Sequence, residues 1–106
     1  MQLCEDIYLI TNNFPKSELY GLTSQIRRCC ISIPSNIAEG HLRGHRTEYR
    51  QFLYVAYGSG AELETQLLIA FRIGYLSEVD FEKINSLLEE IMKMLNKLIS
   101  TLNPKT

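Results

Sequence analysis

The sequence predicts an all-α protein, folded as an up-down-up-down antiparallel four-helix bundle in a single domain. Apolar residues recur at intervals of three and four along almost the whole chain, and nowhere do they alternate over the length of a strand. The 106 residues suffice for one hydrophobic core. Short connections between consecutive helices favour antiparallel neighbours. We therefore expect one domain over residues 1–106, with a composition (45% hydrophobic, 22% charged) typical of a folded protein.

Two helices are predicted in the N-terminal half. The first is short and ends before Pro15, because a proline disfavours helical geometry in the preceding residue. The second covers about residues 19–41, and Pro34 inside it removes one backbone hydrogen bond, so we expect a kink there. Either Gly40 or Gly44 can take the left-handed conformation that ends it. The expected inward-facing residues are Leu3, Ile7, Ile10 and Phe14 in the first helix, and Leu22, Ile26, Cys29, Ile33 and Ile37 in the second.

Two longer helices are predicted in the C-terminal half. The third covers about residues 46–73 and ends at Gly74; it is apolar over more than half its circumference, which indicates neighbours on two sides. Small residues at positions 58–61 would let another backbone approach closely. The fourth opens with Ser77 and Asp80, which resemble a capping box, and Asn103-Pro104 closes it. Its expected inward-facing residues are Phe81, Ile84, Leu87, Leu88, Ile91, Leu95, Leu98 and Leu102.

The sequence favours a cytoplasmic protein. No apolar run approaches the roughly 18 residues that a membrane-spanning helix needs, and the N-terminus has early acids instead of the basic start of a signal peptide. Cys4, Cys29 and Cys30 form neither a CxxC pair nor a disulfide framework. On a helix, Cys29 and Cys30 point about 100° apart. We interpret the three as small buried hydrophobic residues in a reducing compartment.

Positive charge is concentrated around the second connection of the predicted bundle, although the net charge is −1. Residues 16–50 contain six Lys or Arg against three acids, whereas residues 62–90 contain seven acids against two bases. Arg46 and Arg50 share a helix face, and the planar fork of arginine suits bidentate contacts with phosphate. The alternative is that these are solvated charges at helix ends. The candidate nucleic-acid-binding residues are Arg27, Arg43, His45, Arg46 and Arg50.

A second set of polar residues lies beside the core stripe of the second and third helices. Arg28 is expected to enter a buried polar network with Glu62 or Glu64 across the helix pair, because a buried arginine requires an acidic partner. The members of this structural network are Arg28, Asn36, Glu39, Ser59 and Glu62.

Neither a metal site nor a catalytic site is predicted. His41 and His45 are four residues apart, but Gly44 and the expected helix break disrupt the fixed geometry of a zinc-binding helix. The carboxylate pair Glu62 and Glu64 falls on different helix faces, and the chain has no nucleophile elbow or glycine-rich phosphate loop. We expect a non-enzymatic protein that needs no cofactor.

Several segments together resemble a known family. They are LTSQIRR at residues 22–28, SIPSNIAEG at 32–40, FLYVAYGS at 52–59 and ELETQL at 62–67. Over about residues 3–100 the chain is similar to the 23S rRNA intervening-sequence proteins, a bacterial family also called four-helix bundle proteins. It departs from the family in its short first helix and in Cys29-Cys30, which replace small alanine-like residues.

The resemblance implies a homopentameric ring with a nucleic-acid-linked role and no enzymatic activity. The family is similar in fold to the accessory variability protein of diversity-generating retroelements, a pentameric bundle that partners a reverse transcriptase and binds nucleic acid. We therefore expect a homo-oligomer that binds RNA or DNA phosphates without sequence specificity, since no base-recognition motif is present. The alternative is an oligomeric scaffold for a partner protein, such as a reverse transcriptase. A gene that persists in a mobile rRNA insertion with little host function is a third hypothesis.

Overall fold

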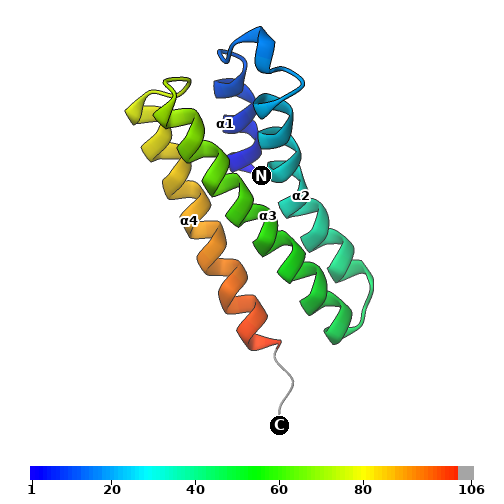
Figure 1. The fold of residues 1–106 in the computed structure, drawn as a ribbon. Coiled ribbons are helices and arrows are strands. Elements are labelled where there is room, and N and C mark those ends of the chain that lie inside the picture. Colours follow the sequence, from blue (N-terminus) through cyan, green and yellow to red (C-terminus); the bar gives the residue numbers. More distant parts are fainter. Residues whose placement is uncertain (103–106) are drawn as a thin grey trace.

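The computed structural model describes residues 1–102 as four α-helices, with no strand among them (Figure 1). The predicted all-α class is confirmed. The predicted end of the last helix at Asn103-Pro104 lies outside the described residues. The elements are α1 (Gln2–Thr11), a short 3-10 helix η1 (Lys16–Glu18), α2 (Leu22–Leu42), α3 (Arg46–Arg72) and α4 (Glu78–Thr101).

In Figure 1 the chain turns back at each connection, and α2 and α3 make the most extensive contact between helices. The short α1 packs on both α2 and α4. Ten residues of helix span only about 15 Å, so α1 covers the upper half of the molecule in Figure 1, beside the start of α2. Helix α2 continues through Pro34 to Leu42. The kink at Pro34 and the ring assembly stay predictions.

The helix ends follow from local chemistry. Helix α1 ends at Thr11, whose hydroxyl donates to the carbonyl of Ile7 at 2.7 Å. Phe14, which we expected on this helix, lies beyond its end but is still buried. Gly44 takes a positive φ of 73° in the turn after α2, and Gly74 a φ of 87° after α3, because residues without a Cβ adopt this region without strain.

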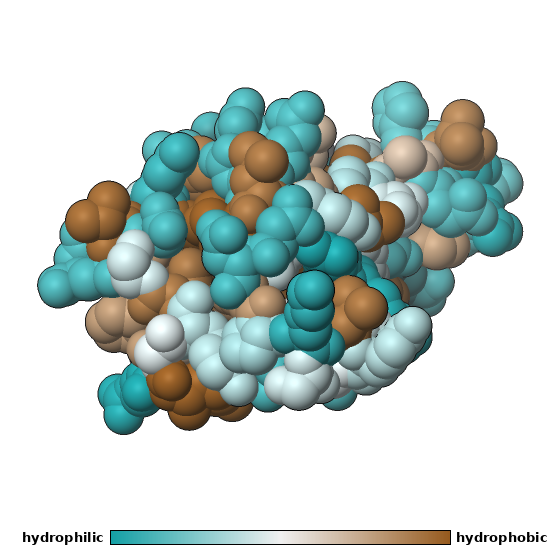
Figure 2. All heavy atoms as spheres, turned by 90° about the horizontal axis from the view of Figure 1, so that it is seen from above, coloured by the Kyte–Doolittle hydropathy of each residue, from teal (hydrophilic) through white to brown (hydrophobic). Residues whose placement is uncertain are grey.

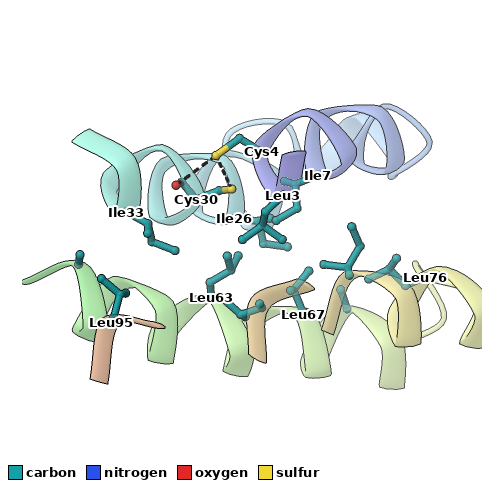
Figure 3. Close-up of a cluster of buried hydrophobic side chains, with 14 of the residues drawn as sticks. Leu3, Cys4, Ile7, Ile26, Cys30, Ile33, Leu63, Leu67, Leu76 and Leu95 are labelled. Carbon is teal, nitrogen blue, oxygen red and sulfur yellow. Dashed lines mark hydrogen bonds between the residues drawn. The ribbon is translucent and has the colours of Figure 1, made fainter. Parts of the chain in front are cut away.

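The core lies where α1 and α2 face α3 and α4 (Figure 3). Ser77 caps α4, as its hydroxyl accepts a hydrogen bond from the backbone N–H of Asp80 at 3.1 Å. Of the 17 expected inward-facing residues, eight are buried and nine are partly buried against the core. Two residues differ from the expectation: Cys30 instead of Cys29 is fully buried in α2, and Ile99 joins the stripe of α4. The largest fully buried side chains are Leu3, Ile7, Ile26, Ile33, Leu53, Leu63, Leu67, Ile84, Leu88 and Leu95.

Two glycines allow helices to approach closely. A methyl group on Gly40 of α2 would lie 2.7 Å from Cβ of Phe52 on α3. A methyl group on Gly60 of α3 would collide with the thioether of Met92 on α4. The neighbours differ in kind, because Cβ of Phe52 is tied to its backbone whereas the end of the Met92 side chain can rotate.

We expect Gly40→Ala to lower the free energy of unfolding by about 1–3 kcal/mol, since overpacking against a rigid neighbour forces the helices apart. Gly60→Ala should cost less than about 1 kcal/mol, because Met92 can move and alanine is the better helix former. Urea denaturation of the two variants beside the unsubstituted protein measures both values. Equal losses of unfolding free energy in the two variants would show that the rigidity of the neighbouring side chain does not determine the cost of the added methyl group.

Candidate nucleic-acid interface

Basic residues from two distant parts of the chain meet at the end of the molecule that carries the α2–α3 turn. The guanidinium of Arg46, in the first turn of α3, donates from Nη2 to the carbonyl of Thr101 at 2.7 Å and from Nε to that of Leu102 at 3.4 Å. Arginine at this place satisfies the free carbonyls at the end of α4 and favourably faces the negative end of its dipole. The fold thereby joins the start of α3 to the end of α4.

The other two arginines of this end also have partners within the chain. Arg43 forms an ion pair with Glu39 at 3.0 Å, with half of each side chain exposed, and its guanidinium lies 5.3 Å from the centre of the Phe52 ring. A pair this exposed contributes at most about 1 kcal/mol. Arg50 donates to the hydroxyl of Tyr54 at 3.3 Å and lies 5.2 Å from the centre of its ring. No buried carboxylate cancels these charges among residues 1–102.

The two histidines border a small groove at the same end. His45 is the N-cap of α3, and its side chain makes no capping hydrogen bond. The first N–H groups of a helix carry the positive end of its dipole, which favours an anion. His41 is exposed and lies edge-on to Tyr49, with the ring centres 5.7 Å apart. The groove holds about 270 Å³ and is lined by Gly40, His41, Gly44, His45, Arg46 and Tyr49.

Two lysines of α4 join this end, and we did not predict them from the sequence. Lys97 lies one turn before Thr101, the residue that Arg46 contacts, and Lys93 lies one turn before Lys97. Both side chains are exposed. No local signal could have found them, because some 50 residues separate them from the arginines, and only the packing of α4 on α3 brings them near. We call Arg43, His45, Arg46, Arg50, Lys93 and Lys97 the basic end.

Arg27, the fifth predicted nucleic-acid contact, does not lie at the basic end. Sixteen helical residues separate it from Arg43, which corresponds to about 24 Å along α2. Its guanidinium donates to the hydroxyl of Thr11 at 2.9 Å and to the amide oxygen of Asn12 at 3.1 Å, and it lies 4.6 Å from the centre of the Tyr8 ring. Arg27 therefore fastens the end of α1 to α2.

The predicted buried network around Arg28 is wrong in its main contact. Arg28 and Glu62 are both exposed, and no ion pair joins Arg28 to an acid in the described part of the chain. Glu39 pairs with Arg43 instead. Helices α2 and α3 place Arg28 and Glu62 at the exposed edge of their contact. Water solvates both charges there, so neither side chain needs an ionic partner.

What remains of the network is a smaller set of hydrogen bonds between α2 and α3. The hydroxyls of Ser32 and Ser59 lie 2.8 Å apart, and the amide of Asn36 donates to the Ser32 hydroxyl at 2.9 Å and carbonyl at 2.7 Å. The Cys29 thiol donates weakly to Glu62, with 3.5 Å between sulfur and oxygen. Burial raises the pKa of the Cys29 thiol above its usual value, so the thiol stays protonated at neutral pH.

Large apolar side chains are exposed in two further regions, of which the first reaches the basic end through Tyr54, the partner of Arg50. Figure 2 shows hydrophobic residues open to solvent between hydrophilic ones. The first region, which we call the α3 face, is spread along α3 with the exposed Glu62 and Thr65 between its two groups; it consists of Tyr54, Val55, Tyr57, Leu68, Ile69 and Ile73. The second, the α1–α2 groove, holds about 580 Å³ and is lined by Tyr8, Leu19, Tyr20, Ser24, Arg27, Arg28, Ile31 and Ser32. Exposed apolar patches of this kind mark interaction surfaces.

Two further observations limit the chemistry. Within residues 1–102 no three His, Cys, Asp or Glu side chains lie close enough together to hold a metal ion. None of the four helices is long and apolar enough to cross a membrane.

Comparison with known proteins agrees with this architecture. The sequence model of the 23S rRNA-intervening sequence proteins matches residues 1–97. Among solved structures, the chain is similar to a protein of unknown function from the S23 ribosomal protein family of Bacteroides thetaiotaomicron, with 26% sequence identity and a TM-score of 0.79. The similarity covers 92% of this chain and 88% of the other. No curated protein sequence matches.

Proposed function

Because this chain belongs to the 23S rRNA-intervening sequence protein family, we propose that it is a non-enzymatic bundle subunit that assembles into a ring and binds nucleic-acid phosphates through its basic end. The observation that carries the proposal is the meeting of α3 and α4 at Arg46, which gathers basic residues from two parts of the chain at one end. We place this activity in the bacterial cytoplasm.

The basic end suits phosphate better than base edges. Its cations lie on helix ends and exposed turns, and the sequence carries no helix-turn-helix spacing, RNA-binding aromatic signature or zinc knuckle that would read bases. Contacts of this kind give affinity that falls steeply with salt and depends little on sequence. The partners of Arg46 and Arg50 inside the chain orient these side chains without neutralising their charge, since carbonyls, a hydroxyl and a ring face are neutral groups. Arg43 also pairs with the half-exposed Glu39 carboxylate, which a phosphate would have to displace or share.

The two apolar regions support assembly. The α3 face and the α1–α2 groove differ in shape and composition, so a contact between the face of one copy and the groove of the next would be head-to-tail. Repeated head-to-tail contacts close into a ring when the rotation permits. We propose a homopentamer, as the family resemblance implies. Such a ring would present five basic ends, and several weak sites acting together bind far more tightly than one.

Binding of labelled single-stranded RNA and DNA, followed by fluorescence anisotropy, tests the phosphate-binding part of the proposal. We expect binding at about 50 mM salt that weakens by a factor of at least about 10 at 200 mM. The double variant Lys93→Gln, Lys97→Gln should weaken binding to every sequence alike. Absence of binding to any nucleic acid at low salt would refute the proposal.

Lys83→Gln is a matched control, because Lys83 is an exposed lysine of the same helix. Fourteen residues, or about 21 Å of helix, separate it from Lys97. It should leave binding unchanged. An equal loss in this control would mean that net charge, and not the basic end, determines binding.

The second candidate function is an oligomeric scaffold that binds a partner protein, such as a reverse transcriptase, without touching nucleic acid. The observation that favours it is that Arg43, Arg46 and Arg50 all have contacts within the chain. A complex that survives nuclease and high salt in a pull-down from the native host would support the scaffold over phosphate binding.

A further inference from the structure

The thiols of Cys4 in α1 and Cys30 in α2 face each other in the core (Figure 3). Their sulfur atoms lie 2.8 Å apart, with the Cys30 thiol directed at the Cys4 sulfur, and the Cys4 thiol also donates to the Cys30 carbonyl at 3.3 Å. Cys30 is fully buried and Cys4 is 7% exposed. Twenty-six residues separate them, so no sequence motif reveals the pair.

We propose that Cys4 and Cys30 are a modification site, at which oxidation joins α1 to α2 through an intrachain disulfide. With hydrogen peroxide as the oxidant, the more accessible Cys4 sulfur is oxidised to a sulfenic acid with release of one water molecule. The Cys30 sulfur then attacks the Cys4 sulfur and displaces the hydroxyl as a second water molecule. The two thiols lose two protons and two electrons in total, and the peroxide gains them to become two water molecules.

The third cysteine is not part of this site. Cys29 points about 100° away from Cys30 around α2, and its thiol faces Glu62 on α3. A disulfide between the adjacent residues 29 and 30 would require their side chains to converge, which helical geometry prevents. The pairing of Cys30 with Cys4 therefore excludes Cys29 as a competitor within one folded chain.

The expected consequence is a firmer attachment of α1. This helix is the shortest of the four, and it supplies Tyr8 to the α1–α2 groove and Thr11 to Arg27. A disulfide removes the unfolded conformations in which α1 and α2 are far apart, so it stabilises the folded chain. It would also hold the groove wall in place. The inference does not depend on nucleic-acid binding or on ring assembly.

Burial sets the rate of the reaction. The pKa of the Cys30 thiol is well above its usual value, chiefly because burial disfavours the thiolate and also because the Cys4 sulfur lies beside it. Little Cys30 thiolate exists at neutral pH, and oxidation should speed up as pH rises. The pair therefore responds slowly, through partial opening of α1.

The test treats the folded full chain, with Cys29→Ser to simplify mapping, with hydrogen peroxide and then digests it with trypsin. We expect mass spectrometry to show peptide 1–16 joined to peptide 29–43, with loss of two hydrogens. The melting temperature should rise by on the order of 10 °C and return after dithiothreitol. Further substitution of Cys4 by serine should abolish both effects.

Three results would overturn the proposal. One is a cross-link that forms in urea but not in the folded chain, and another is sulfinic acid at Cys4 in place of the cross-link. The third is a cross-linked protein whose melting temperature does not rise. Cys4→Ser changes one buried atom and can itself lower the stability of the fold. For each variant the readout is therefore the change in melting temperature that peroxide causes, and not the melting temperature itself.

Discussion

Replacing Leu63 by alanine should lower the free energy of unfolding by about 3–4 kcal/mol, which corresponds to a fall in melting temperature of roughly 15–25 °C. Leu63 is fully buried on α3, at the level where α1 and α2 face α4 (Figure 3). Its truncation removes apolar contacts and leaves a cavity that three packed helices cannot close. The loss is a large fraction of the stability of a domain of this size. Urea and thermal denaturation at one protein concentration measure it.

The matched control is Leu42→Ala. Leu42 is 80% exposed at the end of α2, so the same truncation removes little buried surface. It should change the free energy of unfolding by no more than about 0.5 kcal/mol. If the two variants lost similar stability, the position of the core between the helix pairs would be wrong.

The double variant Leu68→Gln, Ile69→Gln should convert the assembly into monomers. These adjacent residues of the α3 face are 39% and 47% exposed in the single chain. Full burial of an exposed leucine or isoleucine contributes about 1.5–3 kcal/mol, so covering the exposed part of each of these side chains contributes about 1 kcal/mol, and a ring would repeat the contact at every interface. Light scattering should therefore report a mass near 12.2 kDa for the variant and a multiple of it, five by our proposal, for the unsubstituted protein.

Val79→Gln serves as the control for assembly. Val79 is 76% exposed in the first turn of α4, outside both apolar regions. It should leave the mass of the assembly unchanged. A change of mass in this control, or none in the double variant, would place the interface elsewhere.

The helices were largely predictable because the helix-ending and helix-capping residues agreed with the spacing of the apolar residues. Pro15, Gly74 and the Ser77 cap each mark a boundary by a mechanism that acts within a few residues. The start of α2 was placed three residues early, because periodicity alone cannot distinguish its first turn from the preceding 3-10 turn.

Positions decided by tertiary packing were harder to predict. Cys29 and Cys30 both lie near the core stripe, and the approach of α1 to one side of α2 decides that Cys30 is buried. The same packing of α1 on α2 brings the Cys30 thiol into contact with the Cys4 thiol, although nothing in the sequence indicated a disulfide. In both cases the deciding contact comes from a helix far away in sequence.

The candidate site was predicted in part. Arg43, His45, Arg46 and Arg50 were grouped because they are close in sequence, and they lie at one end of the structure. Their contact with nucleic acid stays a prediction. Arg27 was grouped with them by charge alone, and the lengths of α1 and α2 separate it from them.

The most direct test of the central claim, that assembly gathers basic ends for phosphate binding, is the salt dependence of RNA binding by the unsubstituted protein and by the Leu68→Gln, Ile69→Gln variant. The variant keeps every charge, so one subunit presents the same basic end. We predict that the assembled protein binds at least about tenfold more tightly at low salt and shows a steeper dependence on salt. Superimposable binding curves for ring and monomer would contradict the claim.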